Sequence, residues 1–247
     1  MIDVIRRILA VLLLSSISIT ANALILQQAP YSFDGVAGGD GYESVGPIGS
    51  QVAENFQFAE DVTLTKISWW GNYDTAAPND ESFTVRIFES IVVNDNVTKP
   101  VDNPLYETTF LEQGNSTDII DLEGGGVFYY EVAGISLFLQ GGVDYYLSVF
   151  SNDNSLNWFW LESQFGDRLG WYREMDDTDT THVPWILDSP NALNMAFRLE
   201  AEQFTRIPEP AVLFLFLIPL LWLFRREISA NKIYPRFSGR PFHYLGA

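Results

Sequence analysis

The stretch VDYYLSVF, residues 143–150, is the part of the sequence that most clearly indicates the fold. Successive side chains of an extended strand point to opposite faces, so every second residue of this stretch shares a face. One face then holds Val143, Tyr145, Leu147 and Val149. FTVRIF (residues 83–88) and NMAFRLE (residues 194–200) repeat the pattern. This alternation predicts half-buried antiparallel strands.

Outward from these stretches, short apolar runs alternate with clusters of Gly, Asn, Asp and Pro, which is typical of strands separated by turns. We predict eight strands, at residues 52–58, 62–71, 83–91, 105–111, 127–134, 143–151, 155–162 and 194–201. Without helices to cover a parallel sheet, the fold class that follows is all-β, an antiparallel and jelly-roll-like β-sandwich. The apolar phase slips within residues 62–71, which predicts a bulge near Lys66 or a strand that changes sheets. Residues 166–194 have weaker periodicity and are expected to form a long loop.

Charge and composition narrow the classes of function. Residues 24–207 hold 29 of the 32 acidic residues but 7 of the 14 basic ones, a net charge of -22. A field of that sign repels phosphate backbones, so we expect no nucleic acid partner. The chain has no cysteine and two histidines, which excludes disulfides, thiolate metal sites and multi-histidine zinc sites. His182 is then the one histidine of the main domain available to a Ser-His-Asp relay.

The N-terminus has the order of a secretory signal peptide. Arg6 and Arg7 precede the apolar residues 8–14, and small residues follow up to Ala21 and Ala23, an A-x-A cleavage site. We predict a signal peptide at residues 1–23, cut by signal peptidase after Ala23, which directs the chain to the secretion machinery. A buried N-terminal helix is the alternative interpretation.

The C-terminal region has a second hydrophobic segment. Pro208, Glu209 and Pro210 lead into the 14 apolar residues 211–224, followed by Arg225 and Arg226. As a helix this run would reach ~21 Å, less than the roughly 30 Å of a bilayer core. The basic residues beyond it place the far end in the cytoplasm by the positive-inside rule. Both ends of the chain therefore predict that the intervening domain is exported.

This order of a Pro-Glu-Pro tripeptide, a short apolar helix and an arginine cluster resembles the PEP-CTERM sorting signal of Gram-negative bacteria that make exopolysaccharide. In that family a membrane-embedded exosortase recognises the tripeptide and cuts nearby. The resemblance implies transient anchoring in the inner membrane, then release to the envelope, surface or extracellular matrix. It divides the chain into a β-sandwich at 24–206, a sorting signal at 207–227 and a cytosolic tail at 228–247. The sandwich region is also similar to that of many PEP-CTERM proteins. An ordinary membrane anchor is the alternative.

Tryptophan and tyrosine are the residues of the main domain that best suit a ligand site. Sugar-binding sandwiches stack pyranose rings on exposed aromatic faces. In the strand SLNWFWLE, Trp158 and Trp160 are expected to pack in the core. Trp171, Tyr172 and Trp185 lie in the predicted loop, and the sequence leaves open whether they are buried or form a site for exopolysaccharide.

Acidic residues give two further hypotheses. Those in EMDDTDTTH, with Asp176, Asp177 and Asp179 as the metal candidates beside Glu174, offer oxygen ligands that suit calcium, although their spacing matches no known calcium loop. Otherwise we expect no cofactor. Paired carboxylates would suit a polysaccharide-active enzyme, and Glu162 with Glu174 or Asp167 could be nominated. We assign no catalytic residue: the leading hypothesis is a non-catalytic surface or matrix protein, and the alternatives are that enzyme and a purely structural matrix component.

Overall fold

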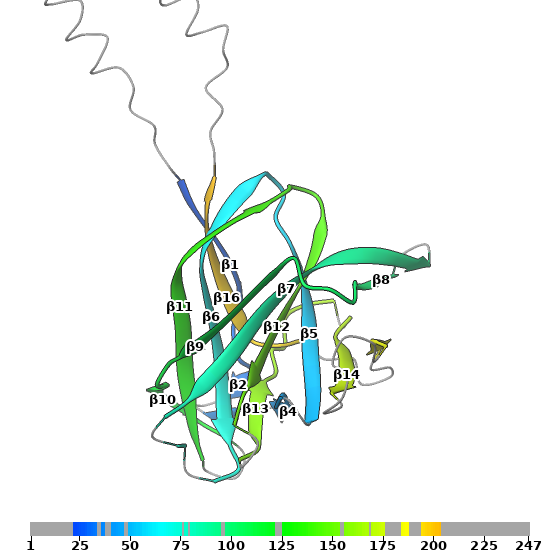
Figure 1. The fold of residues 1–247 in the computed structure, drawn as a ribbon. Coiled ribbons are helices and arrows are strands. Elements are labelled where there is room, and N and C mark those ends of the chain that lie inside the picture. The colour runs from blue at the N-terminus through cyan, green and yellow to red at the C-terminus, as the bar shows by residue number, and fades with distance from the viewer. Residues whose placement is uncertain are drawn as a thin grey trace, which may run out of the picture. The chain divides into compact units, whose positions relative to one another are not determined.

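The computed structural model describes residues 22–203 apart from short gaps, and the statements below concern those residues. The gaps are 34–35, 38–40, 47–48, 76, 79, 95–96, 122–124, 154–155, 168, 176–183 and 188–193. Every regular element in this part is a β-strand, so the all-β prediction is confirmed (Figure 1). The predicted signal peptide, apart from its last two residues, and the predicted C-terminal helix lie outside it. Within it, no helix has the length and hydropathy to cross a bilayer.

The first sheet has nine strands, with β6 near its middle. Its strands are β1 (Asn22–Gln28), β2 (Ser32–Phe33), β3 (Val36–Ala37), β4 (Gly41–Glu43), β6 (Val62–Tyr73), β10 (Asn115–Ile120), β11 (Gly126–Leu139), β13 (Trp158–Leu161) and β16 (Phe197–Gln203). The order is β1-β16-β6-β11-β10-β3-β2, and β13 joins β4 to β6. Neighbouring strands are antiparallel, except that β3 and β10 pair in parallel.

The second sheet has seven strands and is antiparallel throughout. Its strands are β5 (Gly49–Gln57), β7 (Ser82–Asn94), β8 (Val97–Pro100), β9 (Tyr106–Leu111), β12 (Asp144–Ser151), β14 (Trp171–Met175) and β15 (Ile186–Leu187). The order is β15-β14-β5-β12-β7-β8, with β9 also on β7. Trp185, just before β15, donates a hydrogen bond from Nε1 to the carbonyl oxygen of Val101, just after β8, at 3.3 Å. The sheet therefore curls until its two edges meet.

The main core lies between the two sheets and is rich in aromatic rings. Trp158 and Trp160 are fully buried there, as predicted. Phe83 of the second sheet packs against Trp158 of the first, with ring centroids 5.1 Å apart. Gly71 on β6 makes room for this packing, because a Cβ at that position would lie 2.3 Å from the Trp158 ring. Packing of this density leaves little room for side chains of other sizes.

Strands β7 and β12 differ from the sequence prediction because both of their faces are buried. Their predicted core faces do lie in the main core. On the opposite face, a second cluster contains Ala53, Phe88, Tyr146, Trp171 and Trp185. Residues 166–194 are therefore not simply a long loop: they contain β14 and β15, and they supply both tryptophans of this second cluster.

The bulge predicted near Lys66 is confirmed. In the pairing of β16 with β6, Glu200 lies opposite Lys66 while Ala201 lies opposite Leu64, so Thr65 is an extra residue on β6. The Thr65 hydroxyl donates a hydrogen bond to the Glu200 carbonyl oxygen at 2.9 Å. The pairing of β11 with β6 shifts register at the same place. The phase slip in the sequence thus reflects an inserted residue that returns apolar side chains to the core.

Candidate functional site

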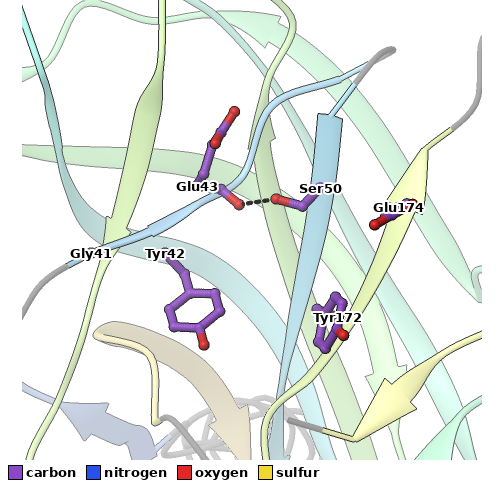
Figure 2. Close-up of a pocket in the computed structure, with 6 residues that line it drawn as sticks. All are labelled: Gly41, Tyr42, Glu43, Ser50, Tyr172 and Glu174. Atoms are coloured by element: carbon purple, nitrogen blue, oxygen red, sulfur yellow. Dashed lines mark hydrogen bonds between the residues drawn. The ribbon is translucent and has the colours of Figure 1, made fainter. Parts of the chain in front are cut away.

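A pocket of about 410 Å³ opens where the margins of the two sheets come together (Figure 2). Its lining residues are Gly41, Tyr42, Glu43, Ser50, Tyr172 and Glu174. The first three belong to β4 of the nine-stranded sheet, and the others to β5 and β14 of the seven-stranded sheet. Two tyrosines, two glutamates and a serine are thus brought together from segments far apart in the chain.

Backbone pairing fixes the two walls of the pocket. On one side β4 pairs with β13, where Gly41 lies opposite Leu161. A Cβ at Gly41 would lie 2.6 Å from the Cβ of Phe159, so a larger residue would push β4 away from its neighbour. On the other side β14 pairs with β5, which places Glu174 opposite Ser50. Each wall is therefore part of a hydrogen-bonded sheet, and preorganised walls of this kind lower the entropic cost of binding.

The two tyrosines supply the apolar surface. Tyr42 is half-buried and packs at the margin of the main core, and Tyr172 is half-buried on β14. Figure 2 shows their rings extending from β4 and β14, on either side of β5. Aromatic rings with partly exposed faces can stack on the apolar face of a sugar ring.

The polar groups lie around these rings. Glu174 and Tyr172 are two residues apart on β14 and share a face, and Ser50 lies beside them. The Ser50 hydroxyl donates a hydrogen bond to the Glu43 carbonyl oxygen at 2.5 Å, which ties the start of β5 to β4. The Glu43 side chain points away from Tyr42, as alternation on a strand requires (Figure 2). Both glutamates are exposed, and ionised carboxylates can accept hydrogen bonds from ligand hydroxyl or ammonium groups.

Of the three aromatic residues considered for binding, the pocket contains Tyr172. Trp171 and Trp185 are 6% and 5% exposed, because the curled seven-stranded sheet encloses them in the second cluster. The Trp185 ring lies 4.4 Å from the guanidinium carbon of Arg173 and packs edge-on against Phe88. Neither tryptophan therefore presents an open face on which a sugar ring could stack.

Arg173 is the charged group of this second cluster. Its Nε donates a hydrogen bond to Gln51 Oε1 at 2.7 Å, while Nη1 has no partner. Burial, together with the nearby charge of Arg86, lowers the pKa of Arg173 to about 10. The adjacent aromatic rings compensate part of the desolvation through cation–π contacts. Arg173 therefore organises the interior of the curled sheet, on the face of β14 opposite the pocket.

The other predicted site residues are distributed as follows. Asp176, Asp177, Asp179 and His182 lie outside the described residues, as do Ala21, the tripeptide 208–210 and Arg225 and Arg226. Ala23 lies in β1, opposite Glu202 of β16. In the described part of the chain, no group of three or more acidic, histidine or cysteine side chains is placed to hold a metal ion.

The carboxylates nominated for catalysis are not gathered in the pocket, except for Glu174. Asp167 accepts hydrogen bonds from Asn55 Nδ2 at 2.7 Å and from the Leu169 backbone at 3.0 Å. Glu162 forms an isolated bridge with Met195. Tyr42, Glu43 and Ser50 were not singled out from the sequence, because β4 has three residues and its neighbours are set by tertiary pairing.

No family of known sequences, no curated protein and no solved structure matches this chain. The sequence signals at the two ends of the chain and the chemistry of the pocket are therefore the features that bear on its function.

Proposed function

We propose that this protein is an exported, non-catalytic surface or matrix protein of the PEP-CTERM type that associates with exopolysaccharide through the pocket between Tyr42 and Tyr172. Its jelly-roll-like sandwich would be carried out of the cell by the signal peptide. It would be held briefly at the inner membrane, and released when an exosortase cuts near Pro208–Pro210. The observation that carries the export proposal is the order of the C-terminal signals, which agrees in orientation with the N-terminal signal.

A hydrophobic segment as short as residues 211–224 suits a protein that is later released from the membrane better than one that stays anchored in it. The apolar run 211–224 would span ~21 Å as a helix, so it can hold the chain at the bilayer but matches its thickness poorly. A cleavable hydrophobic tail of this kind leaves a mature protein without a membrane span, in the way that a GPI signal does.

The observation that supports glycan binding is the aromatic-walled pocket. Tyr42 and Tyr172 offer ring surface for stacking, and Ser50 and Glu174 add hydrogen-bonding groups beside it. The walls are strands of two sheets, so few side chains need to be ordered when the ligand binds. A shallow pocket of this composition suits a few sugar units of a long polymer better than a buried small molecule.

Isothermal titration calorimetry of the full chain in mild detergent, with oligosaccharides from the producing cell's own matrix, tests this proposal. Tyr172→Ala should weaken binding about tenfold or more, since stacking on one ring contributes about 1 kcal/mol beyond area burial. Leu111→Ala, a change at an exposed residue of β9 that does not line the pocket, should leave the affinity unchanged. Equal affinities for the wild type and Tyr172→Ala would refute glycan binding at this pocket.

An enzyme is the second candidate, because two carboxylates line the same pocket. A glycosidase would need both groups directed at one bond, whereas Glu43 points away from the tyrosine on its own strand. Release of reducing sugar that is abolished in Glu174→Gln would establish the enzyme instead. Unchanged matrix assembly with Tyr172→Ala, together with an absence of sugar binding, would favour the purely structural role.

A further inference from the structure

The charge around the pocket narrows the class of sugar that it can bind. The two lining residues that are charged at neutral pH are glutamates, and no lysine or arginine of the described chain lines the pocket. Three of the basic residues are paired elsewhere: Lys66 with Glu200 at 3.0 Å, Arg86 with Glu107 at 2.6 Å and Arg198 with Glu200 at 3.1 Å. No ion pair within the described residues involves Glu43 or Glu174. The pocket is therefore negative, within a domain that is itself strongly acidic.

A negative pocket disfavours the common acidic sugars. A uronate or a sulfated sugar would bring a second negative charge close to Glu174, and no arginine or lysine of the described chain lines the pocket to pair with it. Like charges that lie close together repel each other. An ammonium group on a sugar is positively charged and is therefore attracted to the pocket. It can donate hydrogen bonds to a carboxylate, and such charge-assisted bonds are stronger than bonds between neutral groups.

The tyrosines add to the same preference. A cation held over or beside the face of a tyrosine ring is attracted by the ring quadrupole. Tyr172 and Glu174 share one face of β14, so a single sugar unit can stack on the ring while its substituent reaches the carboxylate. The N-acetylated form of the same sugar could still stack, but it would present a neutral amide to Glu174.

We propose that the preferred ligand is a glycan containing hexosamine units with free, protonated amino groups, bound with the ring on Tyr172 and the ammonium group at Glu174. This inference rests on the proposed glycan-binding function and adds the chemical class of the ligand. It assigns Tyr172 to binding of the ring and Glu174 to selection among sugars.

The test compares three probes on the full chain in mild detergent at pH 6 and low salt: a glucosamine hexasaccharide, its fully N-acetylated counterpart and an oligogalacturonate. We expect the free-amine oligosaccharide to bind at least tenfold tighter than the N-acetylated one, and the oligogalacturonate not to bind. Glu174→Gln should reduce the preference to threefold or less. Tyr172→Ala should weaken both hexosamine ligands. Glu202→Gln, the same charge change at an exposed residue outside the pocket, should keep the preference, which controls for net charge.

The outcomes separate this inference from the function on which it rests. Equal affinity for the two hexosamine ligands, tighter binding of the oligogalacturonate, or equal losses in Glu174→Gln and Glu202→Gln would refute the preference while leaving glycan binding intact. Failure of all three probes and of matrix oligosaccharides to bind the wild type would refute both.

Discussion

Glu54 gives a quantitative prediction because its carboxyl group is fully buried on β5. One oxygen, Oε2, has no hydrogen-bond partner, and the Met195 backbone donates a hydrogen bond to the carboxyl group. Burial raises the pKa of Glu54 well above its ordinary value, and the nearby Asp167 raises it further. The group is therefore protonated in the folded protein at pH values where it is ionised in the unfolded chain.

The sign of the pH dependence follows from this difference. Below the unfolded pKa of about 4.3, both states carry the proton and Glu54 does not affect the pH dependence of stability. Above it, the unfolded state gains stability by ionising, so the free energy of unfolding falls by about 1.4 kcal/mol for each pH unit until the folded pKa is reached. Glu54→Gln keeps the size of the side chain and cannot ionise.

The difference in stability between Glu54→Gln and the wild type should therefore grow in favour of the variant as the pH rises above the unfolded pKa, by at most about 1.4 kcal/mol for each pH unit. Taking the difference cancels the titration of the other carboxylates. Urea unfolding of the full chain in mild detergent, followed by tryptophan fluorescence at pH 4, 5, 6 and 7, measures it. A flat difference for Glu54→Gln would refute the burial argument.

Two further predictions concern packing and are measured by the same unfolding assay. Gly71→Val should destabilise the fold by about 1–3 kcal/mol, because its new side chain would overlap Trp158. Gly126→Ala is the control, since the nearest side-chain atom would be 3.9 Å from the new Cβ, and it should change stability by less than about 0.5 kcal/mol. Equal effects of the two substitutions would contradict the close approach of Gly71 to the Trp158 ring. Trp185→Ala should lower the free energy of unfolding by about 3–5 kcal/mol, because it opens the second cluster. Tyr172→Ala should lower it by about 1 kcal/mol or less. A Trp185→Ala protein as stable as the wild type would show that the second cluster is not a core.

Local patterns predicted the strands that are long and have one face in the main core. The alternation in residues 143–150 correctly placed Tyr145, Leu147 and Val149 in that core. The phase slip around Lys66 located the bulge, because an inserted residue must disturb the period of two. Trp158 was correctly expected inside, since its strand is apolar on both faces.

Features set by tertiary pairing could not be predicted in this way. The second faces of β7 and β12 are buried only because the sheet curls and brings Trp185 onto them, and nothing in their own sequence shows this. The strand β4 has three residues, too few for a period to be recognised, so Tyr42 could not be placed beside Tyr172. The pocket thus depends on tertiary contacts that bring β4 and β5 together with β14, which lies far away in the chain.

The proposal that the protein is exported and sorted is tested most directly by the mass and location of its mature form. The full chain and a Glu209→Ala variant would be expressed in a host with a working exosortase, and intact mass spectrometry would be applied to membrane and released fractions. We predict a released wild-type species that begins near Leu24 and ends near Pro208–Pro210, while the variant keeps its C-terminal segment. If both proteins stay in the membrane at the same mass, residues 211–224 are an ordinary anchor and the sorting proposal is wrong.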